Sequence, residues 1–162
     1  MNERVSEYAA INGHLEILRY LHENGCPWNS LACDHAAMNG HLEILRYLHE
    51  NGCPWNEKTC AFAAGHNHFE TLRYLHKNGC PWDTRACLYA ARHGNLTMLR
   101  WLHENGCPWD ETIAESAAAI GHLTILKYLY ENGCDLGGIL EHAVKNNRFG
   151  IIEWIRTISY DL

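Results

Sequence analysis

Histidine and cysteine are the residues of this chain most suited to chemistry, because both bind metal ions and a cysteine thiolate can attack a substrate. The chain has 12 histidines and 8 cysteines among 162 residues. A structural zinc site needs four close ligands, usually in two short-spaced pairs. Neither Cys-x-x-Cys nor His-x-x-x-His occurs, and the recurring pair is Cys-x6-Cys, as in Cys26 and Cys33. We therefore expect no metal and no cofactor, and keep a thiol- or zinc-dependent sensor as a weaker alternative.

Catalytic motifs give little support for an enzyme. A nucleophilic cysteine needs a nearby histidine and an orienting group. Any such trio would recur several times in this chain, which is unlike an active site. The sequence contains no Gly-rich phosphate loop, no Gly-x-Ser-x-Gly and no His-Glu-x-x-His. We expect no catalytic residue and no enzymatic activity.

The cysteines belong to a larger pattern, the tetrapeptide Gly-Cys-Pro-Trp. It occurs four times at a constant interval, beginning at Gly25, Gly52, Gly79 and Gly106, and Gly133 continues the series. A fixed period of this size indicates a stacked repeat array. We predict an all-α fold, a helical solenoid of six stacked helix-turn-helix repeats in a single domain over residues 1–162. The predicted units are approximately 1–26, 27–53, 54–80, 81–107, 108–134 and 135–162.

One unit, taken from residue 29 to residue 55, shows how each helix pair is specified. Asn29 is a good N-cap for the first helix, and Asn56, Asp83 and Asp110 take the same place. Gly40 is expected to end that helix, with Asn67 and Asn147 replacing the glycine in two units. A second helix over residues 41–50 has an apolar stripe at helical spacing, made of Leu42, Ile44, Leu45 and Leu48. Stacked units would join these stripes into one core.

The eight cysteines and four of the tryptophans fall into repeat columns. The cysteine columns are Cys26/53/80/107/134 and Cys33/60/87. Stacked helices lie roughly 8–10 Å apart, too far for a disulfide between column mates, so we expect free thiols in a reducing compartment. The tryptophans precede each first helix, and we expect them to be structural and buried between units: Trp28, Trp55, Trp82 and Trp109.

Composition limits the partners. The net charge is −6, which argues against nucleic acid as the main ligand. No run of 18 apolar residues exists, so we expect no membrane span. The first residues lack the apolar stretch of a signal peptide. We expect a monomeric, intracellular, cytoplasmic protein.

The motif Ala36-Ala37-x-x-Gly40-His41-Leu42-Glu43-Ile44-Leu45, followed by Leu48 and Gly52-Cys53, resembles the ankyrin repeat. The ankyrin period is about 33, and the interval from Gly25 to Gly52 is shorter. The missing residues fall where ankyrin repeats carry a β-hairpin finger. The chain therefore resembles the finger-poor arrays of giant viruses and protists. The resemblance implies that the histidines of the Gly-His position tie neighbouring units together by hydrogen bonds: His14, His41, His68 and His122.

Residues that differ between units are the candidates for recognition, and by the ankyrin resemblance they line the concave face. Two varied residues follow each Ala-Ala pair, and a second varied column includes Asp34 and Leu88 and should be open where fingers are missing. The predicted partner-binding residues are Ile11, Asn12, Asp34, Met38, Asn39, Gly65, His66, Leu88, Arg92, His93, Ala119 and Ile120. Drift on a solvated surface is the alternative reading of this variation.

The resemblance implies an interaction module, an adaptor or inhibitor, that binds another protein through the concave face. The runner-up is a structural or spacer segment of a larger ankyrin protein. A third column, His22, His49, His76 and His103, lies at the end of each second helix. A protonated imidazole at that position would interact favourably with the helix dipole. We interpret the column as a solvated face.

Overall fold

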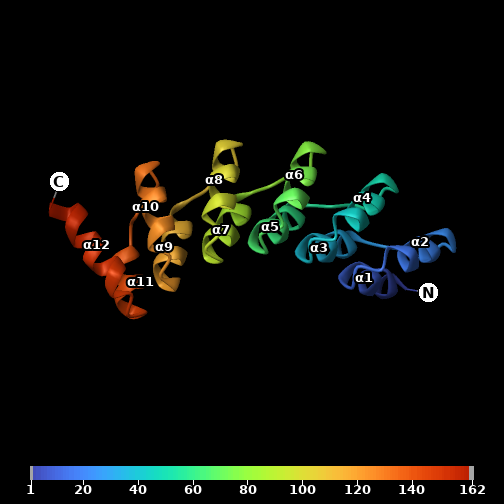
Figure 1. Cartoon of the computed structure of the whole chain (residues 1–162), viewed down its shortest axis with the longest axis horizontal. Helices are drawn as coiled ribbons and strands as arrows, with labels where there is room; N and C mark the ends of the chain where they lie inside the picture. Colours follow the sequence, from blue (N-terminus) through green and yellow to red (C-terminus); the bar gives the residue numbers. More distant parts are fainter. Residues whose placement is uncertain (1, 161–162) are drawn as a thin grey trace.

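The computed structural model describes residues 2–160, which fold as twelve helices in six antiparallel pairs (Figure 1). No strand occurs within that range, so no finger is present there. The pairs are α1 (Glu3–Ile11) with α2 (Leu15–Glu23), α3 (Ser30–Met38) with α4 (Leu42–Glu50), α5 (Glu57–Gly65) with α6 (Phe69–Lys77), α7 (Thr84–Arg92) with α8 (Leu96–Glu104), α9 (Glu111–Ile120) with α10 (Leu123–Glu131), and α11 (Ile139–Lys145) with α12 (Phe149–Tyr160).

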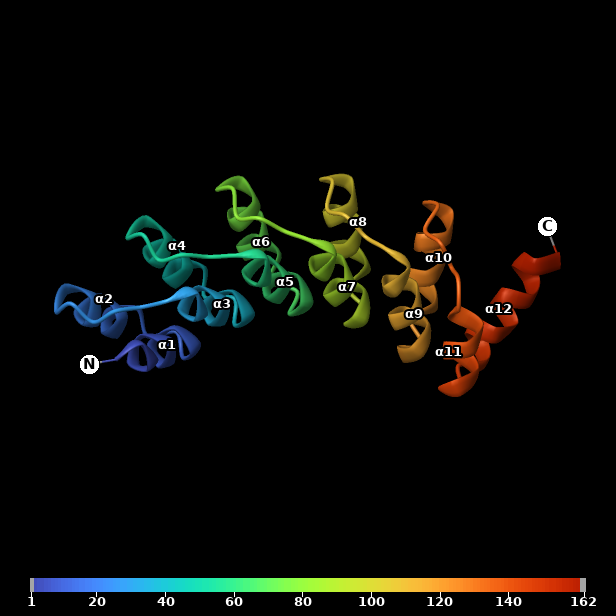
Figure 2. The ribbon, with the colours of Figure 1, turned by 180° about the vertical axis from the view of Figure 1, so that it is seen from behind.

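The pairs stand side by side in an elongated arch, with the chain ends at opposite tips (Figures 1 and 2). The first helix of each pair lies on the inner, concave side of the arch, and the second helix lies on the outer side. The all-α solenoid predicted from the sequence is confirmed.

The predicted caps place the first helices. The side-chain oxygens of Asn29 and Asp83 accept hydrogen bonds from backbone amides two residues on, at 2.9 and 3.0 Å, and Asn56 and Asp110 do the same. Gly40 follows α3 with a φ of +69°, and Asn67 reaches +62° in the same place after α5. These are left-handed values, which asparagine tolerates better than most residues. The predicted helix ends are therefore confirmed.

Different side chains fill the two layers of the core. The inner layer is alanine and cysteine from the first helices, and Ala64, Ala91 and Cys60 are fully buried. The outer layer is large aliphatic side chains from the second helices, including Leu45, Leu72 and others with no exposed surface. Small residues let the first helices approach closely, whereas the second helices spread apart along the outer side (Figure 1).

Candidate functional site on the concave face

The varied residues of the first helices are positioned by the buried alanine pairs. Ala36 and Ala37 have no exposed surface, because both face the core. Directly after them the chain reaches the open side of the helix end, where Met38 is half-buried and Asn39 is exposed. The same alternation places Ile11, half-buried, and Asn12, exposed, at the end of α1. Most predicted recognition residues therefore lie at accessible helix ends on one side of the arch.

Four of the predicted residues meet in one hollow. Leu88 and Arg92 of α7 line a depression of about 380 Å³ together with Ala119 and Ile120 of α9. Ile120 is 36% exposed, a large apolar side chain at the rim. The remaining lining residues are polar and come from α9 and α11: Thr112, Glu115, Ser116 and His142. The hollow thus combines apolar surface with polar groups that could set the orientation of a bound segment.

Glu115 and His142 form a polar pair across the α9–α11 side of this hollow. The Glu115 Oε2 atom lies 3.8 Å from His142 Nε2, and both side chains are about two-fifths exposed. A contact this exposed contributes little to stability. Both side chains line the hollow, where a ligand could reach them. Glu115 belongs to the varied column of Asp34 and Leu88, but neither Glu115 nor His142 is among the predicted partner-binding residues.

Four residues that follow the first helices also cap the C-terminal ends of those helices: Asn12, Asn39, His66 and His93. Asn39 Nδ2 donates to the His35 carbonyl at 2.9 Å, and the ring Nδ1 of His93 lies 2.9 Å from the Tyr89 carbonyl. Asn12 and His66 make the same bonds at 2.7 and 3.0 Å. The rings of His66 and His93 also touch, with centroids 5.8 Å apart. These side chains remain exposed, so capping and recognition are compatible.

Two predicted recognition residues are not accessible. Asp34 is 2% exposed and accepts a hydrogen bond of 2.6 Å from Thr59 Oγ1 of the next unit. Burial raises the pKa of Asp34, and the Thr59 bond opposes this shift. Ala61, its column mate, is 1% exposed, so the prediction of an open column was wrong at both positions. Gly65 is also buried, because Tyr89 of the following unit covers it.

The histidine column of the Gly-His position does join neighbouring units. The Nε2 atoms of His41, His68 and His122 lie 3.0, 3.0 and 3.1 Å from carbonyls of the preceding first helices, at Ile11, Met38 and Arg92. Those carbonyls lie in the last turn of a helix, where no intrahelical donor remains. Asn95 and Arg148 donate in the same way to Gly65 and Ala119. His14 belongs to the first unit and is exposed.

Each tryptophan completes an aromatic joint between two units. The Trp55 indole stacks on His49 with centroids 3.7 Å apart and meets the edge of Tyr74 at 6.4 Å. The same arrangement recurs at Trp28, Trp82 and Trp109. These indoles are half-buried and not enclosed, so the expectation of full burial was too strong.

The interpretation of His22, His49, His76 and His103 as a solvated face holds only in part, because His76 is exposed whereas the other three are half-buried. Each ring stacks on an indole, with interplanar angles of 7–27°. The available signal was the constant spacing from each histidine to the next tryptophan, as from His49 to Trp55.

The cysteines lie in the core, as the repeat columns predict. All eight are buried and free. Each of the five Gly-Cys thiols lies near the carbonyl of the N-cap residue of the first helix in its unit, as Cys53 does at Asn29, 3.2 Å away. A hydrogen bond to Cys53 and burial raise the pKa of Cys33, and burial raises the pKa of Cys134 to about 11. Protonated, enclosed thiols are poor nucleophiles and poor metal ligands.

Within residues 2–160, no group of three or more histidine, cysteine or acidic side chains is placed to hold a metal ion. Over the same residues, no helix combines the length and the apolar character needed to cross a bilayer.

Comparison with known proteins bears on the family. The crystal structure of the human ASB11 ankyrin repeat domain superposes with a TM-score of 0.74 at 18% identity, over 91% of this chain and 80% of that one. This likeness shows the fold alone. Curated protein sequences contain no significant match. A family model described as ankyrin repeats in many copies matches residues 7–49, 59–103 and 87–130, which is more than half of the sequence. The chain therefore belongs to the ankyrin-repeat family.

Proposed function

We propose that this protein is an interaction module that binds one partner protein through its concave face, as an adaptor or an inhibitor. Ankyrin repeats generally mediate protein–protein interaction. The observation that carries the proposal is the hollow in which Leu88, Arg92, Ala119 and Ile120 converge. These positions vary between units, whereas the second helices are nearly copied. Partly exposed apolar side chains beside polar groups are typical of a recognition surface.

We propose further that the protein acts as a monomer in the reducing cytoplasm, and that it binds another protein and no other class of partner. Eight buried free thiols support a reducing compartment. The net charge of −6 supports a protein partner over nucleic acid.

Charge substitution in the hollow tests this function. The tagged full chain is compared with the double variant Leu88→Glu/Ile120→Glu by quantitative mass spectrometry of captured proteins, and the captured partner is then purified for direct titration. We expect the double substitution to weaken the affinity of the chain for the captured partner by about a hundredfold, because it would place two carboxylates in an apolar contact. Circular dichroism confirms that the variant is folded.

The matched control is Thr124→Glu, an exposed position of α10 on the outer side. Its affinity should equal that of the parent chain. A partner retained equally by all three proteins would contradict binding through the hollow. The chain would then be better described as a structural spacer of a larger array.

A further inference from the structure

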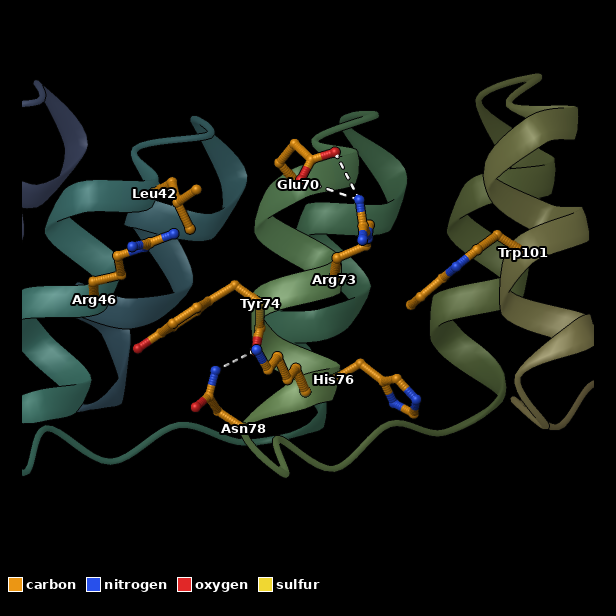
Figure 3. Close-up of a pocket in the computed structure, with 9 residues that line it drawn as sticks. Leu42, Arg46, Glu70, Arg73, Tyr74, His76, Asn78 and Trp101 are labelled. Atoms are coloured by element: carbon orange, nitrogen blue, oxygen red, sulfur yellow. Dashed lines mark hydrogen bonds and ion pairs between the residues drawn. The ribbon is translucent and has the colours of Figure 1, made fainter.

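A second hollow lies on the outer side of the arch, away from the first helices. It measures about 630 Å³ and is open between α4, α6 and α8. Figure 3 shows Arg46 and Tyr74 on the α4 side of α6, and Arg73, His76 and Trp101 around the space toward α8. Lys77 and Glu70 of α6 also line it, with Leu42 and Asn78. None of these residues belongs to the concave site.

The sequence departs from its own repeat at this hollow. Lys77 stands where the other four copied second helices have glutamate, at positions 23, 50, 104 and 131. Trp101 stands in a column that is otherwise tyrosine in those helices, and Phe69 in one that is otherwise leucine. Phe69 and Trp101 touch edge to face at 5.4 Å, so the two changes form one enlarged aromatic contact. The α6–α8 joint is thus modified at its surface in charge and in aromatic area.

The charges of the hollow are predominantly positive. Arg46, Arg73 and Lys77 line it, and Glu70 is the one carboxylate among its lining residues. Arg46 also lies 4.0 Å from Glu43, which is outside the lining, in an exposed pair. Glu70 lies 3.3 Å from Arg73, and this pair is more than half exposed, so it holds the guanidinium only weakly. Lys77 is exposed and makes no ion pair within residues 2–160. This cationic surface stands on a chain with a net charge of −6.

Aromatic faces support the cationic side chains. The Arg46 guanidinium lies 5.3 Å from the centre of the Tyr74 ring, a cation–π contact on the α4 side of α6. On the other side the half-buried Trp101 indole contacts His76 at 5.6 Å. Guanidinium groups can bind carboxylates through two parallel hydrogen bonds, and flat aromatic surfaces accept the aliphatic part of a peptide.

We propose that this outer hollow binds an acidic, extended segment of a partner protein. Carboxylates of the segment would pair with Arg73, Lys77 and Arg46, and its backbone and aliphatic stems would lie on Tyr74 and Trp101. Nucleic acid is disfavoured, because a long polyphosphate chain would meet the negative charge of the rest of the protein. The site is independent of the concave hollow, so the protein can hold two partners at once.

Titration with a defined peptide tests the proposal. The probe is a fluorescent peptide of alternating glutamate and glycine, with a glutamine peptide of the same length as the neutral reference, followed by anisotropy on the full chain. We expect saturable binding of the acidic peptide and no binding of the glutamine peptide. The variant Lys77→Glu, which restores the residue of the other units, should weaken binding by about tenfold. It should remain folded, because glutamate occupies the same place four times elsewhere.

Two controls separate this site from general charge effects and from the concave site. Arg19→Glu changes an exposed cation that belongs to the column of Arg46 and Arg73 but lies outside the hollow. It should leave peptide affinity unchanged, as should Leu88→Glu/Ile120→Glu. Equal losses in Arg19→Glu and Lys77→Glu, or no loss in Lys77→Glu, would overturn the proposal. So would a single-stranded oligonucleotide of the same charge that binds as tightly as the acidic peptide, since the surface would then recognise polyphosphate.

Discussion

Neighbouring units contact one another through different side chains in the inner and outer layers of the arch. First helices meet through alanine and cysteine with no exposed surface, such as Ala91 and Cys87, so their backbones lie close together. Second helices meet through large rings at their edges, as where Trp55 bridges His49 and Tyr74. Close packing leaves no room for added atoms on the inner side. Spreading leaves surface hollows on the outer side, which the aromatic rings only partly fill.

Removing part of a unit should have the largest effect, because both layers depend on the repeat register. Deleting residues 54–80 removes one whole repeat and restores Gly-Cys-Pro-Trp across the junction. We expect a shorter, cooperatively folded protein, since each unit contacts only its neighbours. Deleting residues 54–66 removes α5 and leaves α6 without its partner, and we expect this chain to be unfolded. Circular dichroism compares the two, and similar spectra would contradict the proposed unit boundaries.

Adding volume to the inner layer is the next most damaging change. Ala91→Leu should cost about 3 kcal/mol of unfolding free energy, because the helices on both sides leave no space for the larger side chain. The matched control Thr97→Leu lies at an exposed position of α8 and should change stability by about 0.5 kcal/mol or less. Urea denaturation measures both. Equal costs at the two positions would show that the inner layer is not tightly packed.

Removing a tryptophan ring from the outer layer should lower the free energy of unfolding by less than removal of a fully enclosed ring would. Trp55→Ala should lower stability by about 2–3 kcal/mol, below the range for a fully enclosed indole, because the ring is half-buried. Trp55→Phe keeps a ring against His49 and should cost about half as much. The same denaturation experiment separates the variants. A cost under about 1 kcal/mol for Trp55→Ala would mean that the joint contributes little.

Glycines at the ends of the first and the second helices, such as Gly40 and Gly52, allow a comparison with a smaller expected effect on stability. A Cβ atom at Gly40, with φ +69°, would come within 3.0 Å of the His68 ring, whereas one at Gly52, with φ +78°, meets nothing within 4 Å. Both alanine variants must adopt left-handed backbone, which costs about 1 kcal/mol. Gly40→Ala also disturbs the His68 bond to Met38, so its total should be about 2 kcal/mol. Equal values would show that this bond adds nothing across the joint.

The smallest expected effect is the pH dependence of His68. Burial lowers the pKa of His68 from its ordinary value of 6.5, and the bond to the Met38 carbonyl opposes this shift. The unfolded chain therefore takes up a proton first as the pH falls. The stability associated with this neutral ring is present above about pH 6.5 and is lost as the pH falls through the folded value.

The variant His68→Asn isolates that contribution, because Asn95 already fills the same column and donates to Gly65. The urea midpoint of the parent chain should fall more steeply than that of the variant between about pH 7 and about pH 5. Parallel curves would show that His68 does not contribute to the acid sensitivity.

Most of the fold could be predicted because its signals are local and repeated. Caps such as Asn29, left-handed ends such as Gly40 and Asn67, and the stripe of the second helix each depend on a few adjacent residues. Their recurrence at a constant interval then specifies stacking. The accessibility of the candidate recognition residues was predicted less well. Asp34 and Gly65 were predicted to contact a partner, but residues of the next unit, Thr59 and Tyr89, cover them.

The amino-acid sequence by itself determined six helix pairs, their ends and their order, because helix capping and hydrophobic periodicity act over a few residues. The joining role of the histidines was implied by the resemblance to ankyrin repeats. Only the tertiary structure decided which varied residues are accessible, that His49 stacks on Trp55, and that Arg46, Lys77 and Trp101 line one hollow. Burial and side-chain contact depend on the separation of neighbouring units. That separation follows from how alanine and aromatic side chains pack across the whole stack.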